Sequence, residues 1–308
     1  MNRGLKALGA LSTGLMFIVL QMGALVTNTG SADGCGASWP LCKGTFMPDW
    51  DYEAIIEFSH RAVSGLGGLS VLILAVWAWR ALPQRPLVRW LAVGALGFTV
   101  FQGLLGAAAV VWPQPKAVLA LHFGISLICF SLVLLTTSLL MSPPVGSAVS
   151  PLVTRWVWTV ILFAYGVIYL GAYVRHMRAS AACLGWPLCN GQLIPSLYGP
   201  VGANFAHRVG AALLVLLVVR LFFLVRRMAG DRTELRRAGG LALLFILLQV
   251  AEGALMPLGY LNLLTQMAHT ALITLFWGAL SYLGLGVLLG AASRVVPGLG
   301  DRSPGLAP

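Results

Sequence analysis

The sequence predicts an all-α integral membrane protein of eight transmembrane helices, arranged as two related four-helix bundles. Of the 308 residues, 58% are hydrophobic and only 9% are charged, whereas a soluble domain carries roughly a quarter charged residues. Eight apolar stretches have the length of about 20 residues that a helix needs to cross a bilayer. A set of residues also recurs in the second half of the chain. Lipid must therefore surround much of the surface.

The expected helices follow the apolar runs in chain order. They cover 7–27, 55–79, 87–111, 117–140, 153–174, 202–225, 237–257 and 262–290. The first run, preceded by Arg3 and Lys6, resembles a secretory signal peptide in its charge pattern. We expect a membrane helix instead, because the run is too long for a signal and has a counterpart later in the chain. The Gly- and Pro-rich tail Pro297–Pro308 is expected to be disordered.

The distribution of charge predicts the orientation of the helices. Basic residues gather in the segments that share one side of the membrane, namely Arg3, Lys6, Arg80, Arg85, Arg89, Arg155, Arg226, Arg227, Arg232, Arg236, Arg237 and Arg294. The loop after the first helix carries four acidic residues and only Lys43. Cytoplasmic loops are enriched in Lys and Arg, so both termini are expected to be cytoplasmic. The basic residues of the cytoplasmic segments account for the net charge of +11 in a protein of the cell membrane. We therefore expect no nucleic-acid partner.

An internal repeat relates the two halves. The matched residues are Trp39-Pro40-Leu41-Cys42 with Trp186-Pro187-Leu188-Cys189, His60-Arg61 with His207-Arg208, Gln102 with Gln249, and His122 with His269. These pairs lie 147 residues apart, and the offset before the cysteine loop is 148, as for Gly23 and Gly171. Four helices return the chain to the same side, so the repeat is expected to be parallel, about an axis along the membrane normal. We assign 1–146 to the N-terminal half and 147–296 to the C-terminal half.

Four of the five histidines belong to this repeat: His60, His122, His207 and His269. Each falls near the start of a helix that begins at the outer face, so all four share one depth near that face. Diagonal helices of a four-helix bundle lie roughly 12–14 Å apart, which leaves room for a porphyrin between two imidazoles. A histidine in an apolar helix is often a hydrogen-bonded core residue, but ionisable groups in membranes are functional by default. We therefore predict one haem site in each half, whereas zinc or copper would favour a tighter cluster.

Two further polar residues have no match in the repeat. His176 has Asn28 as its counterpart and sits at a helix end, so it is interpreted as structural. Glu252 has Leu105 as its counterpart and lies near the outer end of its helix. We interpret it as an interfacial acid.

The cysteines fall mainly in two outer loops. Cys35 and Cys42 share the first loop, and Cys183 and Cys189 share its repeat. The outer side is oxidising and permits disulfides, so a structural disulfide in each loop is the leading interpretation. A redox-active first pair that handles electrons for the site beneath it, or metal binding, are the alternatives. Cys129 is interpreted as a packing residue.

The two halves differ beside the first histidine of each. Glu57 lies one helical turn before His60, on the same helix face, and its counterpart is Asn204. A carboxylate transfers protons and an amide does not. This difference suggests that one half carries out a reaction and the other half assists it. The alternative is that Glu57 is an exposed acid at a helix N-terminus. Arg61 and Arg208 are interpreted either as contacts of haem propionates or as snorkelling side chains.

These segments together resemble haem A synthase. The resemblance rests on Gly23-Ala24-Leu25-Val26-Thr27, Thr29-Gly30-Ser31, the paired-cysteine loop and Glu57-Phe58-Ser59-His60-Arg61. It extends over all eight expected helices. Cysteine pairs in both halves are similar to the bacterial type.

The resemblance implies an oxidoreductase that converts a methyl group of haem O to a formyl group, giving haem A for cytochrome oxidase. It implies that His60 and His122 hold the substrate haem, with Glu57 in the reaction. His207 and His269 would hold a haem B for electron transfer. The implied partners are membrane lipid, a haem O synthase and cytochrome oxidase assembly proteins.

Two other functions would also use these histidines. A bis-histidine cytochrome b that only carries electrons explains the four histidines but not the difference between Glu57 and Asn204. A haem transporter or chaperone explains haem near the outer face but needs no second, permanent haem. Haem extracted from the purified protein separates these alternatives, because only the enzyme should contain haem O or haem A beside haem B.

Overall fold

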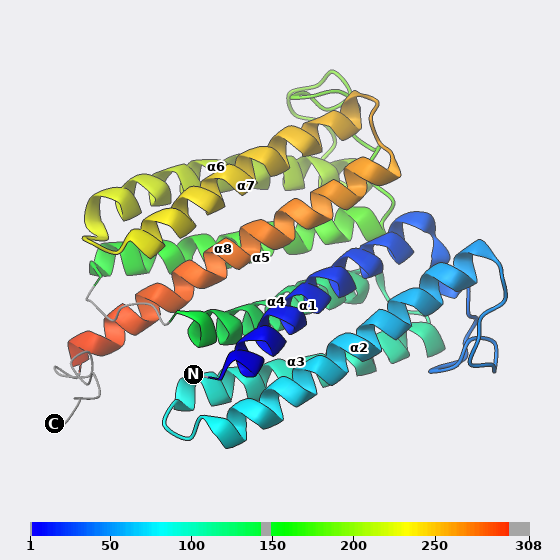
Figure 1. The fold of residues 1–308 in the computed structure, drawn as a ribbon. Coiled ribbons are helices and arrows are strands. Elements are labelled where there is room, and N and C mark those ends of the chain that lie inside the picture. Colours follow the sequence, from blue (N-terminus) through cyan, green and yellow to red (C-terminus); the bar gives the residue numbers. More distant parts are fainter. Residues whose placement is uncertain (1, 143–148, 296–308) are drawn as a thin grey trace, which may run out of the picture.

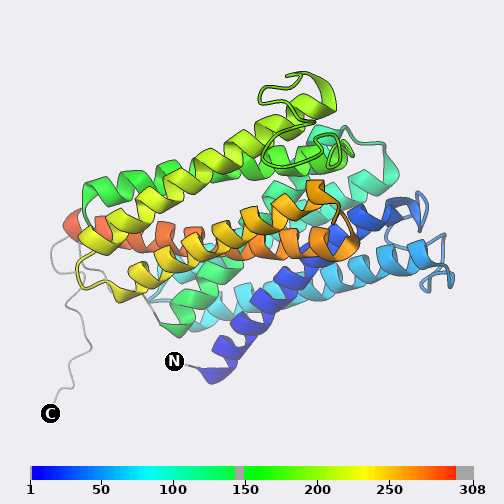
Figure 2. The same ribbon diagram turned by 90° about the horizontal axis from the view of Figure 1, so that it is seen from above.

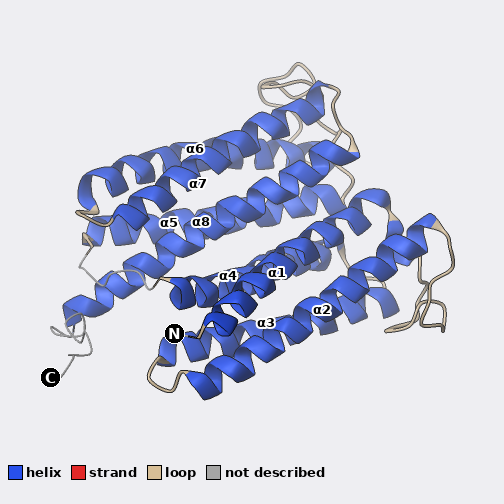
Figure 3. Cartoon of the chain, in the orientation of Figure 1, coloured by secondary structure: helices blue, strands red, loops and turns tan. Residues whose placement is uncertain are grey.

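The computed structural model describes residues 2–142 and 149–295, with side chains to residue 291. The described chain consists of helices joined by loops (Figure 3). The helices are α1 (Arg3–Thr29), α2 (Tyr52–Ala81), α3 (Pro86–Val111), α4 (Lys116–Met141), α5 (Pro151–His176), α6 (Gly199–Met228), α7 (Thr233–Leu255) and α8 (Leu263–Val295), with short 3-10 turns η1 (Ser31–Asp33) and η2 (Met256–Leu258). Eight of these segments are long and apolar enough to cross a membrane, which confirms the predicted fold class. The expected disordered tail lies outside the described residues.

The observed helices extend beyond most of the expected spans. The largest difference is at the end of α8, which reaches Val295 rather than 290. We expected Arg294 to follow the last helix, but it belongs to α8. An apolar run reports only the part of a helix that crosses hydrocarbon, whereas the backbone hydrogen bonds of the helix continue into the polar interface.

Local sequence signals explain where several helices begin and end. The Asp51 side chain caps α2 by accepting a hydrogen bond from the Ala54 amide at 2.8 Å. Pro86 and Pro151 occupy the first turns of α3 and α5, where the missing N–H of proline is tolerated. The first helix, α1, ends at Thr29 and is capped by Gly30, whose φ of 73° is readily adopted by glycine. These signals set the ends of the helices, whereas apolar composition specifies their interiors.

The eight helices form two groups of four that lie side by side (Figure 1). One group contains α1–α4 and the other contains α5–α8, and they meet where α4 packs against α5 and α8, and α1 against α8. The loops 30–51 and 177–198 project from the same end of the molecule, opposite the N-terminus (Figures 1 and 2). The segments that carry the paired cysteines are thus placed on one side.

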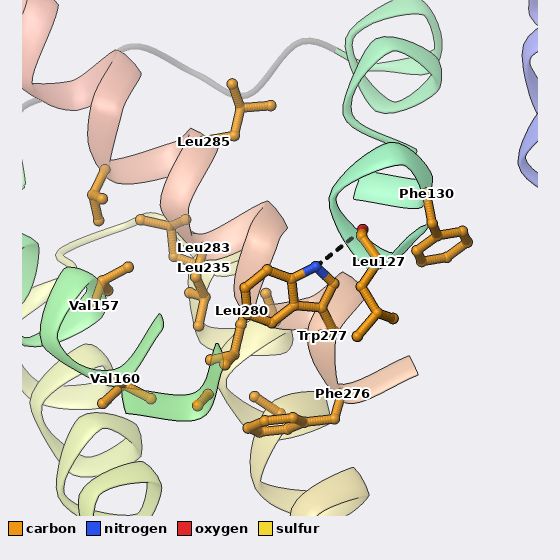
Figure 4. Close-up of a cluster of buried hydrophobic side chains, with 14 of the residues drawn as sticks. Leu127, Phe130, Val157, Val160, Leu235, Phe276, Trp277, Leu280, Leu283 and Leu285 are labelled. Atoms are coloured by element: carbon orange, nitrogen blue, oxygen red, sulfur yellow. Dashed lines mark hydrogen bonds between the residues drawn. The ribbon is translucent and has the colours of Figure 1, made fainter. Parts of the chain in front are cut away.

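Buried side chains join the two groups of helices (Figure 4). Trp277 of α8 is 6% exposed and donates a hydrogen bond from its indole nitrogen to the Leu127 carbonyl of α4 at 3.1 Å. The hydroxyls of Ser131 and Ser281 lie 2.8 Å apart across the same interface. Cys129 is a free cysteine and is fully buried in this apolar cluster, which is consistent with its interpretation as a packing residue.

Candidate haem sites

A large cavity lies between the helices, beneath the two cysteine loops. Its volume is about 1390 Å³, and it is lined by side chains of all eight helices. This volume exceeds the roughly 300–1,000 Å³ of an ordinary small-molecule site. His60, His122, His207 and His269 all line it, together with Glu57, Arg61 and Arg208. The structure therefore brings the predicted site residues of both halves to one cavity.

Each of the four histidines stands against a glycine of the preceding helix. The pairs are His60 with Gly23, His122 with Gly106, His207 with Gly171, and His269 with Gly253. A Cβ atom on Gly171 would lie only 2.6 Å from Cε1 of His207, and one on Gly253 would lie 3.1 Å from Cε1 of His269. These glycines leave space for the imidazoles. Gly23 and Gly171 were predicted only as matched residues of the repeat, and Gly106 and Gly253 were not predicted, although these two lie at the same offset as the histidines they contact.

In three of the four imidazoles, one ring nitrogen has no hydrogen-bond partner within the described residues. The Nδ1 atoms of His60, His122 and His207 are buried and have no hydrogen-bond partner within the described residues. Buried polar atoms are nearly always hydrogen-bonded, so His60 and His122 are not the satisfied core histidines of an apolar helix. Imidazoles in a large, mostly apolar cavity fit haem ligation, for which histidine is a common axial ligand.

The fourth imidazole has a carboxylate partner that the sequence analysis missed. Nδ1 of His269 lies 2.6 Å from a carboxylate oxygen of Glu252, whose side chain is only 12% exposed. Glu252 lies near the end of α7, as expected, but it is also a partner of His269 and not simply an interfacial acid. Glu252 and His269 lie on adjacent helices, α7 and α8, and no local pattern relates their side chains. The available signal was the mismatch with Leu105 in an otherwise matched segment.

Glu57 is buried and linked to the first cysteine loop. It is 3% exposed, so the alternative of an exposed acid at a helix end is wrong. One carboxylate oxygen accepts a hydrogen bond from the Cys35 amide at 2.7 Å, and the other pairs with Arg61. In the other half, Asn204 accepts from Arg208 at 3.0 Å and donates to the Ala179 carbonyl at 2.7 Å. The matched residues thus tie helix to loop in both halves, but only Glu57 can exchange a proton.

Arg61 and Arg208 hold the cysteine loops over the cavity. Arg61 donates to the carbonyls of Ser38 at 2.8 Å and Leu41 at 2.7 Å. Arg208 donates to the carbonyl of Gly185 at 2.8 Å. The Arg61 side chain is only 11% exposed, which contradicts a snorkelling arginine at that position. Contact with haem propionates stays a prediction for both arginines.

The cysteines of each loop are joined as expected. Cys35 pairs with Cys42 and Cys183 pairs with Cys189, with Cα atoms 4.4 and 4.7 Å apart. These distances fall within the usual range for disulfides. The structural interpretation of the pairs is consistent with this bonding. A redox role for the first pair stays an open alternative.

The first loop is further ordered by charged groups outside the membrane-spanning segments. Lys43 bridges Asp49 and Asp51 at 3.1 Å each. The pKa of Lys43 is raised, chiefly by its hydrogen bond with Asp51 and then by that with Asp49. The pKa of Asp51 is lowered, first by the hydrogen bond from the Ala54 amide and then by Lys43. The start of α2, which carries Glu57 and His60, is therefore fixed by a capped and charge-paired loop.

His176 also lines the cavity, at the end of α5. Its neighbour Arg175 donates to the Thr270 hydroxyl at 3.2 Å. Their repeat counterparts in α1 are Asn28 and Thr27. The C-terminal half thus presents two more basic side chains to the cavity than the N-terminal half does at the same positions.

The amino-acid sequence was compared with known proteins. Residues 49–281 match a family model, COX15-CtaA, described as cytochrome oxidase assembly protein. A protein from Symbiobacterium thermophilum named Heme A synthase is 55% identical over 290 residues, which cover 91% of this chain and 94% of that protein. Heme A synthases of Halalkalibacterium halodurans and Geobacillus kaustophilus are 45% and 42% identical, over 92% and 96% of this chain and 97% and 95% of their own. The matched glycines, histidines and cysteine loops described above thus belong to a multi-pass membrane protein of the COX15-CtaA family of cytochrome oxidase assembly proteins.

Proposed function

We propose that this chain is a haem A synthase, an oxidoreductase that converts a methyl group of haem O to a formyl group and so provides haem A for cytochrome oxidase. The observation that carries the proposal is the 55% identity to a Heme A synthase over 91% of the chain. The cavity lined by four matched histidines provides the place where haem would bind. A pure electron carrier would not need the buried carboxylate of Glu57.

The proposal assigns different tasks to the two halves. His60 and His122 hold the substrate haem O in the N-terminal half, residues 1–146. His207 and His269 hold haem B in the C-terminal half, residues 147–296. The assignment is supported by Glu57, the buried acid one turn from His60, whose place is taken by Asn204 in the other half. Haem B, when bound, supplies one-electron transfer.

Conversion of a C–H bond to a C–OH bond involves proton transfer, and Glu57 is placed to take part in it. Its carboxylate is buried, lines the cavity and is held by Arg61 and the Cys35 amide. A fixed acid or base within reach of the reacting group typically contributes about 10²–10⁴-fold to a rate. Two successive hydroxylations, each a two-electron oxidation of this carbon, replace two C–H bonds with C–OH bonds. The resulting hydrated aldehyde loses water to leave the formyl group. The disulfide loop above Glu57 would limit the access of bulk water.

The proposed topology places both haem sites near the outer face of the cell membrane. Both termini are cytoplasmic, and the two halves form a parallel repeat. This orientation is supported by the basic residues of the segments opposite the cysteine loops. A haem O synthase in the same membrane would be the source of the substrate, and cytochrome oxidase assembly proteins would receive the product.

Co-expression with a haem O synthase in a host that lacks haem A tests the proposed activity. Haems extracted from the membranes would be separated by chromatography. We expect haem A to form only when both proteins are present. A protein that contains haem B and haem O but forms no haem A would contradict the proposal.

A further inference from the structure

The hydrogen bond between Glu252 and His269 distinguishes one haem site from the other. The two side chains come from adjacent helices and approach to 2.6 Å, with exposed fractions of 12% and 29%. The bond uses Nδ1 of the imidazole and one carboxylate oxygen, while the other oxygen is buried with no partner within the described residues. A ring whose Nδ1 is occupied in this way has its Nε2 left for a metal.

Among the described residues, the N-terminal half has no equivalent of this bond. Leu105 occupies the position that matches Glu252, and the matched glycines Gly106 and Gly253 follow directly in sequence. Nδ1 of His122, the counterpart of His269, is buried without a hydrogen-bond partner in the described chain. Both histidines therefore have a glycine beside them, but only His269 has a carboxylate partner.

A partly buried cation lies near this carboxylate. Arg175 of α5 donates to the Thr270 hydroxyl at 3.2 Å, next to His269 in sequence, and to the Gln266 carbonyl at 3.4 Å. Its charge lies close enough to attract that of Glu252. A buried unpaired charge is costly, so the arginine offsets the cost of placing an acid here. Thr27, the counterpart of Arg175, carries no charge.

We infer that Glu252 is a positioning residue for the haem of the C-terminal half: it fixes the His269 ring with Nε2 towards the iron and strengthens that ligand. The inference rests on the proposed function, which places haem B between His207 and His269. Histidine ligands commonly donate their second ring nitrogen to a carboxylate, which fixes the tautomer and raises the basicity of the ligand. A more basic ligand stabilises ferric iron and lowers the reduction potential of the haem.

This asymmetry suits two haems with different fates. A permanent haem has to stay bound through many turnovers, whereas a substrate haem has to leave as product. His269 with its carboxylate provides the stronger ligand, and His60 and His122, whose Nδ1 atoms lack partners in the described chain, provide the weaker pair. Glu252 would therefore help the C-terminal half, and not the N-terminal half, to retain its haem.

Two substitutions of Glu252 test the inference on the purified haem-containing protein. Glu252→Leu places the N-terminal counterpart's side chain here and removes the acceptor. Glu252→Gln keeps an acceptor of the same length without the carboxylate. We measure the rate of haem B transfer to excess apomyoglobin and the midpoint potential of the bound haem B. Glu53→Gln, which removes an exposed acid in the first turn of α2, is the matched control.

We expect Glu252→Leu to lose haem B about 10–100-fold faster, the usual effect of losing such a partner. Glu252→Gln should release haem B within a few-fold of the parent rate, and its midpoint potential should rise. The control should match the parent in both measurements. If Glu252→Leu is too unstable to purify, the potential of Glu252→Gln alone decides, and an unchanged potential overturns the inference.

Parental release and potential in Glu252→Leu would likewise overturn it, as would an equal shift in the control. His269→Ala separates this failure from failure of the proposed function. If His269→Ala loses haem B but Glu252→Leu and Glu252→Gln behave like the parent, only the positioning role is wrong. If His269→Ala keeps haem B, its assigned site is wrong.

Discussion

At the scale of single residues, Glu57 has two proposed roles that experiment must separate. One is to hold the first cysteine loop, and the other is to exchange protons. Its carboxylate binds the Cys35 amide and pairs with Arg61, so it holds the first cysteine loop in place. Asn204 also ties its helix to its loop, but it accepts from Arg208 and donates to the Ala179 carbonyl. An amide at position 57 keeps one acceptor oxygen and loses the second. Only the acid can exchange protons.

Glu57→Gln removes the proton-exchanging group and keeps a side chain that can accept hydrogen bonds. We expect haem A production to fall about 10²–10⁴-fold, while haem B is retained because its proposed ligands lie in the other half. The capacity to hold haem O should also remain, because His60 and His122 are unchanged. The reciprocal Asn204→Asp should leave product formation within a few-fold of the parent. Chromatography of extracted haems measures all three pigments.

A normal yield of haem A from Glu57→Gln would reduce Glu57 to a loop tether. Loss of haem B in the same variant would mean that the two halves are assigned the wrong way round. These outcomes are distinct, because the first concerns the reaction and the second concerns the location of the cofactor.

The glycines behind the histidines allow a second test at this scale. A Cβ on Gly171 would lie 2.6 Å from Cε1 of His207, so Gly171→Ala must displace the imidazole or the helix. We expect this variant to lose most of its haem B. Gly166→Ala, in the same helix, adds a methyl group where nothing lies within 4 Å and should retain it. The measurement is haem B per polypeptide. Equal retention in the two variants would show that the space left by Gly171 is not needed to position His207.

At the scale of elements, the two cysteine loops act as caps on the helices that carry the first histidine of each half. Each loop is closed by a disulfide and bound by an arginine four residues after Glu57 or Asn204. Asp51 links the first loop to α2 by capping it and by pairing with Lys43. The position of Glu57 relative to the cavity therefore depends on the loop as well as on its own helix.

Thiol labelling tests the state of these loops. The denatured and unreduced protein should have about one reactive thiol, Cys129, which is the free cysteine of the structure. The native protein should label slowly, because Cys129 is fully buried. Cys129→Ser should abolish labelling before reduction. Reaction of all five cysteines in protein never exposed to reductant would exclude disulfides in both loops.

At the scale of the whole molecule, one cavity reaches into both groups of helices. The α4 interface with α5 and α8 joins them through buried contacts such as Trp277 with Leu127. Two haems held in this cavity would be neighbours within one packed protein. Such an arrangement suits electron transfer between a permanent haem and a substrate haem.

Removal of single histidines tests this division of the molecule. His207→Ala and His269→Ala should each lose stoichiometric haem B, because each removes one of two proposed axial ligands. His60→Ala and His122→Ala should keep haem B and lose haem A production. Absorption spectra and extracted haem per polypeptide measure the result. Full haem B retention in both His207→Ala and His269→Ala would contradict the assignment of the C-terminal half.

The sequence by itself determined the eight helices and the residues from which the site is built. Backbone groups in lipid must be satisfied within the helix, so long apolar runs have few alternative structures. The matched offsets of His60 with His207 and His122 with His269 then identified the histidines that line the cavity. The cysteine pairs could be predicted because residues so close in sequence have few other partners in a short loop.

Only the tertiary structure decided what these residues touch. Glu252 meets His269 across two helices, Gly171 meets His207 across two others, and Arg61 reaches carbonyls of a loop 20 or more residues away. Helical periodicity relates residues three or four positions apart, but the rotation and approach of neighbouring helices depend on packing over their whole length. The sequence pattern therefore located the histidines, whereas the packing of one helix against another selected their partners.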